Sequence, residues 1–293
     1  MTTTSAAETA ARSTGQRVTG TLGTYLAFAV FLVVLLLPVY WILLSSLLPQ
    51  SQLLSVPPTY FSTDLTLDNY QRALQQIPLT VYLRNSVVFS LGSAALSVAT
   101  SFLAAYAFAR LTFRWSNVLL LFFLLSMALP QISTTIPLFQ LFQKLHLVNT
   151  LYGLILLQGS LMVPFTIWTL ISFIRQVPNE LEEAARIDGA NRLRAIWAIL
   201  VPLMMPALGT MFVINFIITW NELFYPLVFA TQTSTQPMTI GLLQLNQQNA
   251  GTGAARPWDL ISALSAVMVI PIVLLVIVAQ RSIVEGLTRG AGK

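Results

Sequence analysis

Long runs of apolar residues separated by short polar segments dominate this chain. A helix that crosses a bilayer needs about 20 consecutive apolar residues. Five runs meet this requirement clearly, and they cover residues 22–48, 83–109, 151–174, 208–230 and 260–279. Since 56% of the residues are hydrophobic and only 9% are charged, the chain has too little polar surface for a soluble globule of 293 residues. The sequence therefore predicts an all-α, polytopic membrane protein.

A sixth run, residues 118–139, is weaker, because its apolar stretch stops at Pro130 and residues 131–135 are polar. The distribution of lysine and arginine decides whether this run is a transmembrane span, since these residues are enriched in cytoplasmic loops. With six spans and a cytoplasmic amino terminus, only four of the 15 basic residues lie outside: Arg72, Arg84, Lys144 and Arg256. Without the sixth run, the arginine-rich segment after residue 174 would lie on the outer side of the membrane. We therefore expect six transmembrane helices, with both termini in the cytoplasm.

The polar segments divide the chain into four parts. The first residues are rich in Thr, Ser and Ala without an apolar period, which is typical of disorder. The expected parts are a disordered cytoplasmic tail (1–20), the first span with an external loop (21–82), a transmembrane core (83–280) and a cytoplasmic tail (281–293). In the second span small residues recur every fourth position, a spacing that lets membrane helices pack closely: Ser93, Ser97, Ser101 and Ala105.

The densest cluster of charge lies between the fourth and fifth spans, in residues 177–203. Asn179 with Glu182 three residues later forms a capping-box pattern, which predicts a helix start. Gly189 can adopt the left-handed conformation that ends a helix, so the predicted helix covers residues 180–188. A helix this short is marginal alone. We expect another protein surface to hold it, although a plain linker between two spans is the structural alternative.

A second, amphipathic helix is predicted after the glycine. Its apolar residues recur at positions i, i+3, i+4 and i+7, and they are Leu193, Ile196, Trp197 and Leu200. This pattern indicates a helix that lies along an apolar surface. Pro202 and Pro206 are then expected to mark the turn into the fifth span.

The loop carries a resemblance to a known family. The sequence Glu183-Ala184-Ala185, with Gly189, Ile199 and Val201-Pro202 after it, is similar to the EAA loop of permease subunits in binding-protein-dependent ABC importers. Val201 departs from that pattern, which usually has Leu. Other segments resemble the carbohydrate, maltose-type branch, and they are Leu67-Asp-Asn-Tyr70, Leu83-Arg-Asn-Ser86, Trp220-Asn-Glu222 and residues 280–288.

The resemblance implies the permease subunit of an ATP-driven sugar importer in a bacterial or archaeal inner membrane. Its implied partners are a second homologous permease, two ATP-binding subunits and an extracytoplasmic sugar-binding protein. It implies that the loop couples to an ATP-binding subunit through a helix between spans four and five. The expected coupling residues are Glu180, Glu182, Glu183, Ala184, Ala185, Arg186, Asp188, Gly189, Ala190 and Arg192.

The residues themselves indicate a non-catalytic subunit without cofactor or metal. Lys144 and Lys293 lie outside any Gly-x-x-x-x-Gly-Lys-Ser/Thr loop, so no phosphate cradle is present. The absence of cysteine excludes thiolate metal sites and a cysteine nucleophile, and one histidine makes no metal site. We therefore place ATP hydrolysis on the partner subunits.

Glu222 is the one acid inside an apolar span, where an ionisable group costs about 3 kcal/mol or more and is a functional candidate. We expect the substrate path to include Asn215, Trp220, Asn221 and Glu222. In the structural alternative, Glu222 bonds to neighbouring helices together with the two asparagines. The competing function is a proton-coupled secondary transporter with Glu222 as carrier. Against it, the sequence shows neither a partner charge in the membrane nor inverted repeats.

Overall fold

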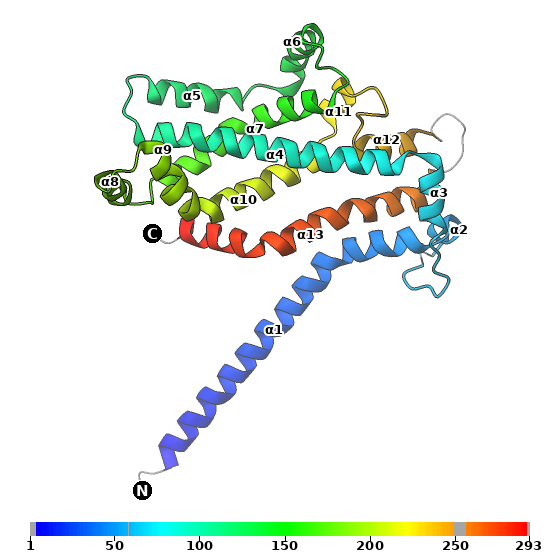
Figure 1. Cartoon of the computed structure of the whole chain (residues 1–293). Coiled ribbons are helices and arrows are strands. Elements are labelled where there is room, and N and C mark those ends of the chain that lie inside the picture. Colours follow the sequence, from blue (N-terminus) through cyan, green and yellow to red (C-terminus); the bar gives the residue numbers. More distant parts are fainter. Residues whose placement is uncertain (1–3, 58, 249–255, 292–293) are drawn as a thin grey trace. The chain divides into compact units, whose positions relative to one another are not determined.

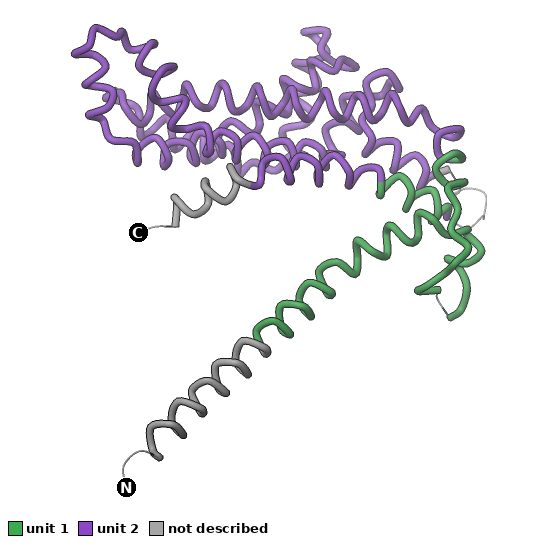
Figure 2. Tube along the Cα trace, turned by 60° about the horizontal axis from the view of Figure 1, so that its bottom comes forward, with its two compact units in different colours: residues 1–72, 257–266 green, residues 73–256, 267–293 purple. Residues whose placement is uncertain are grey.

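The computed structural model in Figure 1 describes residues 4–57, 59–248 and 256–291, with side chains over 24–57, 59–247 and 256–280. Within these ranges all regular structure is helical and no strand occurs. Five helices are long and apolar enough to cross a membrane, and a bent pair makes up to six. The expected all-α polytopic chain is therefore confirmed. Two compact units divide it, residues 1–72 with 257–266 and residues 73–256 with 267–293 (Figure 2).

The first unit contains α1 (Thr4–Leu47), α2 (Gln50–Leu53), the start of α3 (Asp68–Gln76) and the start of α13 (Trp258–Ala291). Among the residues whose side chains are described, Thr24–Leu47 of α1 is long and apolar enough to cross a membrane. The sequence predicts a disordered tail over residues 1–20, but the helix extends back to Thr4, in keeping with the good helix formers Ala and Glu in this segment.

Asn69 holds the carboxyl end of α1. Its Nδ2 donates to the carbonyl oxygens of Ser46 at 3.0 Å and Leu48 at 2.8 Å, and the Tyr70 hydroxyl donates to Ser46 Oγ at 2.8 Å. The last carbonyls of a helix have no partner within it, so these bonds satisfy groups that would otherwise be orphaned. The Leu67-Asp-Asn-Tyr70 segment therefore has a structural role in this unit.

The second unit is organised around α4 (Leu79–Arg110), which packs against α7 (Leu151–Ile174) and α10 (Val201–Trp220) (Figure 1). The small residues predicted to lie inside the bundle do so, and all four are 0% exposed. Ser101 Oγ donates to the Val163 carbonyl of α7 at 3.3 Å. A Cβ at Gly159 of α7 would lie 3.2 Å from the Ser93 carbonyl oxygen, so the two backbones come close here.

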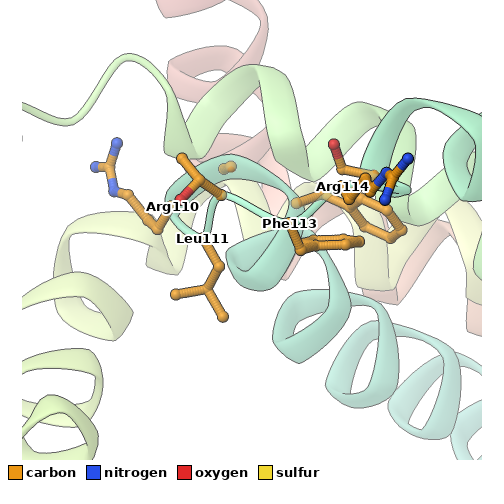
Figure 3. Close-up of a pocket in the computed structure, with 8 residues that line it drawn as sticks. Arg110, Leu111, Phe113 and Arg114 are labelled. Carbon is orange, nitrogen blue, oxygen red and sulfur yellow. The ribbon is translucent and has the colours of Figure 1, made fainter.

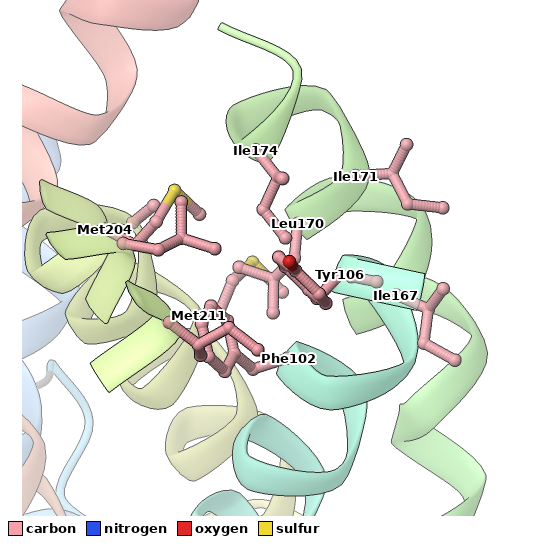
Figure 4. Close-up of a cluster of buried hydrophobic side chains, with 12 residues drawn as sticks. Phe102, Tyr106, Ile167, Leu170, Ile171, Ile174, Met204 and Met211 are labelled. Carbon is pink, nitrogen blue, oxygen red and sulfur yellow. The ribbon is translucent and has the colours of Figure 1, made fainter. Parts of the chain in front are cut away.

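One end of this bundle is filled by a cluster of buried apolar side chains (Figure 4). Phe102 and Tyr106 come from α4, while Met204 and Met211 come from α10. The side chains from α7 are Ile167, Leu170, Ile171 and Ile174. Since lipid is as apolar as these side chains, close packing and not hydrophobic transfer holds the helices together.

The predicted third span is not a straight helix. It is divided into α5 (Ser116–Ser126) and α6 (Gln131–Lys144), which are bent by 101° relative to each other. Pro130 stands before α6 with extended backbone, ψ 132°, because proline cannot continue the hydrogen bonds of α5 and disfavours helix in the residue before it. In the sequence, the end of the apolar stretch at Pro130 indicated the position of this break in the helix.

The predicted boundaries of the fifth span are wrong at both ends. A continuous helical stretch runs over Arg192–Trp220, and it contains α9 (Arg192–Ala195), a π-helical turn (Ile196–Leu200) and α10. Pro202 does not end the helix, because the wide π turn precedes it and the proline falls at the start of α10. The other end of the span is Trp220 and not Ala230, since α11 (Phe224–Phe229) is a separate helix.

The second unit also contains α8 (Asn179–Ile187), α12 (Met238–Gln248) and the rest of α13. The predicted sixth span lies in α13, whose membrane-spanning part is Trp258–Gln280. Helix α13 continues to Ala291 through the residues predicted as a cytoplasmic tail. The side chains of 281–291, and residues 292 and 293 altogether, lie outside the described part of the chain, as does most of the 280–288 motif.

Candidate functional site

The charged loop forms the short helix α8 (Asn179–Ile187), which lies with α9 beyond the end of the α4–α7 bundle (Figure 1). The expected bounds, 180–188, are right to one residue, and Arg186 lies in the last turn. Gly189 has φ +86°, as predicted for a left-handed helix end. After it, Asn191 caps α9, accepting from the Arg194 backbone N–H at 2.8 Å.

The predicted capping box is wrong. The residue before the helix is Pro178, and no side chain caps the first turn. Asn179 is instead the first helical residue. The reason lies in Glu182, whose carboxylate is directed to α4 and not back to the start of its own helix.

Glu182 fixes α8 to α4 through a buried charge pair. Arg110 Nε donates to Glu182 Oε1 at 2.8 Å, and the Tyr106 hydroxyl donates to Oε2 at 2.9 Å. Arg110 Nη2 also donates to the Val177 carbonyl at 2.7 Å. Glu182 is only 9% exposed, so a buried charge is compensated by an opposite charge and two good hydrogen bonds. We call Tyr106, Arg110 and Glu182 the α4–α8 clamp.

Sequence reasoning found Glu182 but missed its two partners on α4. The available signal was the position of Arg110 at the last turn of a span, four residues after Tyr106, where both side chains share one helix face. The 72-residue separation between Arg110 and Glu182 lies outside any local pattern.

The rest of α8 faces outward. The exposed coupling candidates are Glu180, Glu183, Ala184, Arg186, Asp188, Gly189 and Arg192, while Ala185 and Ala190 are half-buried. Large apolar side chains accompany them, with Ile187 86% exposed, Leu193 65% and Trp197 62%. Of the four predicted apolar positions of the second helix, only Ile196 and Leu200 are buried. An exposed surface of mixed apolar and charged side chains is typical of a protein interaction site.

The connection between α4 and α5 lies next to the clamp and surrounds a pocket of about 460 Å³ (Figure 3). Arg110 and Arg114 both line it. Arg110 is engaged with Glu182, and the Arg114 guanidinium lies 5.9 Å from the centre of the Trp115 ring. An arginine paired with an exposed tryptophan is typical of the membrane interface.

A larger cavity, of about 790 Å³, lies between the bend of α5 and α6, helix α7 and helix α10. Its wall is mostly apolar, with a few convergent polar side chains, as in ligand sites generally. The polar residues that line it include Gln131, Thr134, Gln158, Ser160, Asn215 and Glu222.

Asn215 is held rigidly in this wall. Its Nδ2 donates to Ser97 Oγ at 3.2 Å and to Thr166 Oγ1 at 3.0 Å. Because the Thr166 hydroxyl donates its own proton to the Met162 carbonyl at 2.9 Å, its oxygen must accept from Asn215, which fixes the orientation of the amide. Asn215 Oδ1 and Gln158 Oε1 are both buried without a hydrogen-bond partner.

Of the other predicted path residues, Glu222 lines the cavity, but Trp220 and Asn221 do not. Trp220 is 2% exposed and its Nε1 donates to the Met268 carbonyl at 3.1 Å. Asn221 Nδ2 donates to the Ile217 carbonyl of its own helix at 2.8 Å. Glu222 Oε1 accepts from the backbone N–H groups of Phe224 and Tyr225 at 2.8 and 3.2 Å, so it caps α11.

The motif Leu83-Arg-Asn-Ser86 holds the segment before α12. Asn85 Nδ2 donates to the carbonyl oxygens of Ser234 at 3.0 Å and Gln236 at 2.9 Å, and Ser86 Oγ accepts from the Met238 N–H at 2.7 Å. Asn85 is 0% exposed. Among the described residues, no group of three or more His, Asp or Glu side chains is placed to hold a metal ion.

Comparison with known proteins gives the family. Residues 97–289 match the family model of the binding-protein-dependent transport system inner membrane component. The sulfoquinovosyl glycerol transport system permease protein SmoH of Agrobacterium fabrum is 35% identical over 269 residues, 92% of this chain and 93% of that protein. The trehalose/maltose transport system permease protein MalG of Thermococcus litoralis is 34% identical over 265 residues, 89% and 92% of the two chains.

A solved structure shares the fold. It belongs to a bacterial ABC transporter involved in the import of the acidic polysaccharide alginate, with a TM-score of 0.76 and 22% identity over 91% of this chain and 97% of that one. The matches to the two permease proteins cover 92% and 89% of this chain, and they therefore include both the helical bundle and the loop with α8. This chain belongs to the family of binding-protein-dependent transport system inner membrane components.

Proposed function

We propose that this chain is one permease half of an ATP-driven sugar importer and that α8 is its coupling helix. The observation that carries the proposal is the α4–α8 clamp, because it fixes a short, outward-facing helix to a long membrane helix. Glu182 uses one face of α8 for this attachment, and the apolar and charged residues of the remaining surface stay free for a partner. The sugar-transporting relatives at 34–35% identity support the same function.

In this proposal an ATP-binding subunit receives α8 on the cytoplasmic side, and a second, homologous permease with its own ATP-binding subunit completes the complex. When the two ATP-binding subunits close on ATP, α8 moves with them as a rigid element. The clamp carries that movement to α4. Because α4 packs along α7 and α10, which line the 790 Å³ cavity, the movement changes access to the path.

The cavity is the proposed sugar path within this chain. Asn215 contributes an amide held by two hydrogen bonds, and Gln158 contributes a second amide. The oxygens of both lack donors, and sugar hydroxyl groups are donors of the required kind. An extracytoplasmic binding protein would deliver the sugar, and the chain would lie in the inner membrane with both termini in the cytoplasm. Glu222 caps α11, which supports a structural role for it over that of a proton carrier.

Site-directed cross-linking tests the docking surface, and the absence of cysteine from the natural chain makes single-cysteine variants clean reporters. Ala184→Cys and Ile187→Cys, both exposed on α8, should cross-link to the ATP-binding subunit in the assembled complex. Thr112→Cys, exposed on the α4–α5 connection, is the matched control and should cross-link weakly or not at all. An assembled complex in which the two α8 cysteines stay unlinked would overturn the proposal.

A further inference from the structure

The segment between α2 and α3 exposes large apolar side chains that none of the contacts above explains. Val56 is 95% exposed, Phe61 85% and Tyr60 59%. The segment has one charged residue, Asp64, and it is engaged, since Gln52 Nε2 donates to its Oδ2 at 3.2 Å. Exposed apolar side chains grouped in this way mark an interaction surface.

The segment turns back along α1. The Tyr40 hydroxyl donates to the Tyr60 carbonyl at 2.8 Å, and the rings of Trp41 and Tyr60 are 5.6 Å apart. The rings of Tyr40 and Phe61 are 6.4 Å apart. Since Tyr40 precedes the end of α1 at Leu47 by seven residues, Tyr60 and Phe61 lie about 10 Å back along the helix from its end.

That position falls near an expected membrane boundary. The apolar run of α1 starts at Leu22, and about 20 helical residues cross the hydrocarbon core, so the opposite boundary is expected near Trp41. Tyr40 and Trp41 lie at this boundary, and Tyr25 lies within one turn of the other one. Aromatic residues at both ends of a span are typical of the two interfaces of a bilayer. The chain therefore returns to the level of the lipid headgroups.

Some polar groups near these side chains are bonded within the protein. Ser62 Oγ donates to Gln52 Oε1 at 3.0 Å, and the Tyr60 carbonyl accepts from Tyr40. Val56, Tyr60 and Phe61 are left exposed beside the exposed polar residues Thr63 and Asp64. A mixture of exposed aromatic, apolar and polar side chains is typical of the membrane interface.

From this arrangement we propose that Val56, Tyr60 and Phe61, here called the interfacial patch, lie in the lipid headgroup region and anchor the end of α1 to the bilayer surface. The occupant of the patch is lipid and not another protein. The inference is independent of the transported substrate and of the coupling through α8.

A fluorescent label at each position tests the proposal in the complete complex reconstituted in phosphatidylcholine vesicles. Phe61→Cys and Val56→Cys are labelled with the polarity-sensitive dye NBD, and Gln71→Cys, exposed on α3 within the same unit, is the control. Labels in the interfacial patch should emit at shorter wavelength, be quenched several-fold less by aqueous iodide than the Gln71 label, and be quenched by lipids with a nitroxide near the headgroup.

Two results would overturn the proposal. Equal iodide quenching at Phe61, Val56 and Gln71 would place the patch in water. Protection from iodide without quenching by the nitroxide lipids, or protection that arises only when a binding protein is added, would show that protein covers the patch. Because Val56 makes almost no contact, its label reports the environment even if a label at Phe61 disturbs the ring contacts.

Discussion

Removing the carboxylate of the α4–α8 clamp should weaken the attachment of α8 more than any other single change on that helix. Glu182→Ala leaves the Arg110 guanidinium, 11% exposed, without its charge partner and leaves the Tyr106 hydroxyl without its acceptor. Breaking a buried pair in this way costs about 3–5 kcal/mol. Since Arg110 keeps its bond to the Val177 carbonyl and the pair is not fully dry, we expect about 3 kcal/mol.

The free energy of unfolding of the purified chain in mixed micelles, titrated with sodium dodecyl sulfate, measures this cost. Glu180→Ala is the matched control, because Glu180 is exposed on the same helix, and its effect should stay within about 0.5 kcal/mol. A double-mutant cycle with Tyr106→Phe and Glu182→Ala isolates the hydrogen bond between these two side chains and should give a coupling of about 1.5–3 kcal/mol, as for a bond to a charged group. Equal costs for Glu182→Ala and Glu180→Ala, or a cycle without coupling, would refute the clamp.

Four further substitutions test other parts of the structure. Asn85→Ala leaves the buried Gln236 carbonyl and the partly buried Ser234 carbonyl without their donor, at about 1–3 kcal/mol for the buried one, and should lower the thermal midpoint of the complex clearly. At Gly153 an added methyl would overlap the Leu147 carbonyl oxygen, so Gly153→Ala should cost about 1–3 kcal/mol by overpacking. At Gly189 an added methyl meets no atom within 4 Å, so Gly189→Ala should lose only about 1 kcal/mol, because of its left-handed backbone. The same melting assay compares the two variants. Asn215→Leu should reduce sugar uptake by vesicles about tenfold, the loss of one hydrogen bond of about 1.4 kcal/mol, and unchanged uptake would exclude Asn215 from the path.

The features that the sequence predicted well depend on local pattern. The fourth span is an example, because a mostly apolar run without charges between Thr150 and Arg175 leaves α7 only one possible extent. The buried serine positions of α4 followed in the same way from a four-residue spacing. Gly189 ends α8 as expected, since few other residues adopt its backbone conformation at low cost.

The features that the sequence could not give depend on distant contacts. Glu182 satisfies the capping-box pattern, yet a buried arginine and a tyrosine 72 and 76 residues away make stronger bonds to it than the helix start would. Trp220 was predicted to lie in the substrate path, but only the position of α13 shows that its indole N–H is already bonded to the Met268 carbonyl. The bend after α5 was visible as a loss of apolar character, while its angle depends on packing against α7.

The most direct test of coupling through α8 is the ATPase rate of the reconstituted complex when loaded binding protein is added. Ala185→Glu places a charge on α8, and Thr112→Glu places the same charge on the α4–α5 connection as a control. If α8 is the coupling helix, Ala185→Glu loses both the stimulation of the ATPase and sugar uptake, while Thr112→Glu keeps both. Normal stimulation and uptake in Ala185→Glu would show that residues 177–203 only connect two membrane helices.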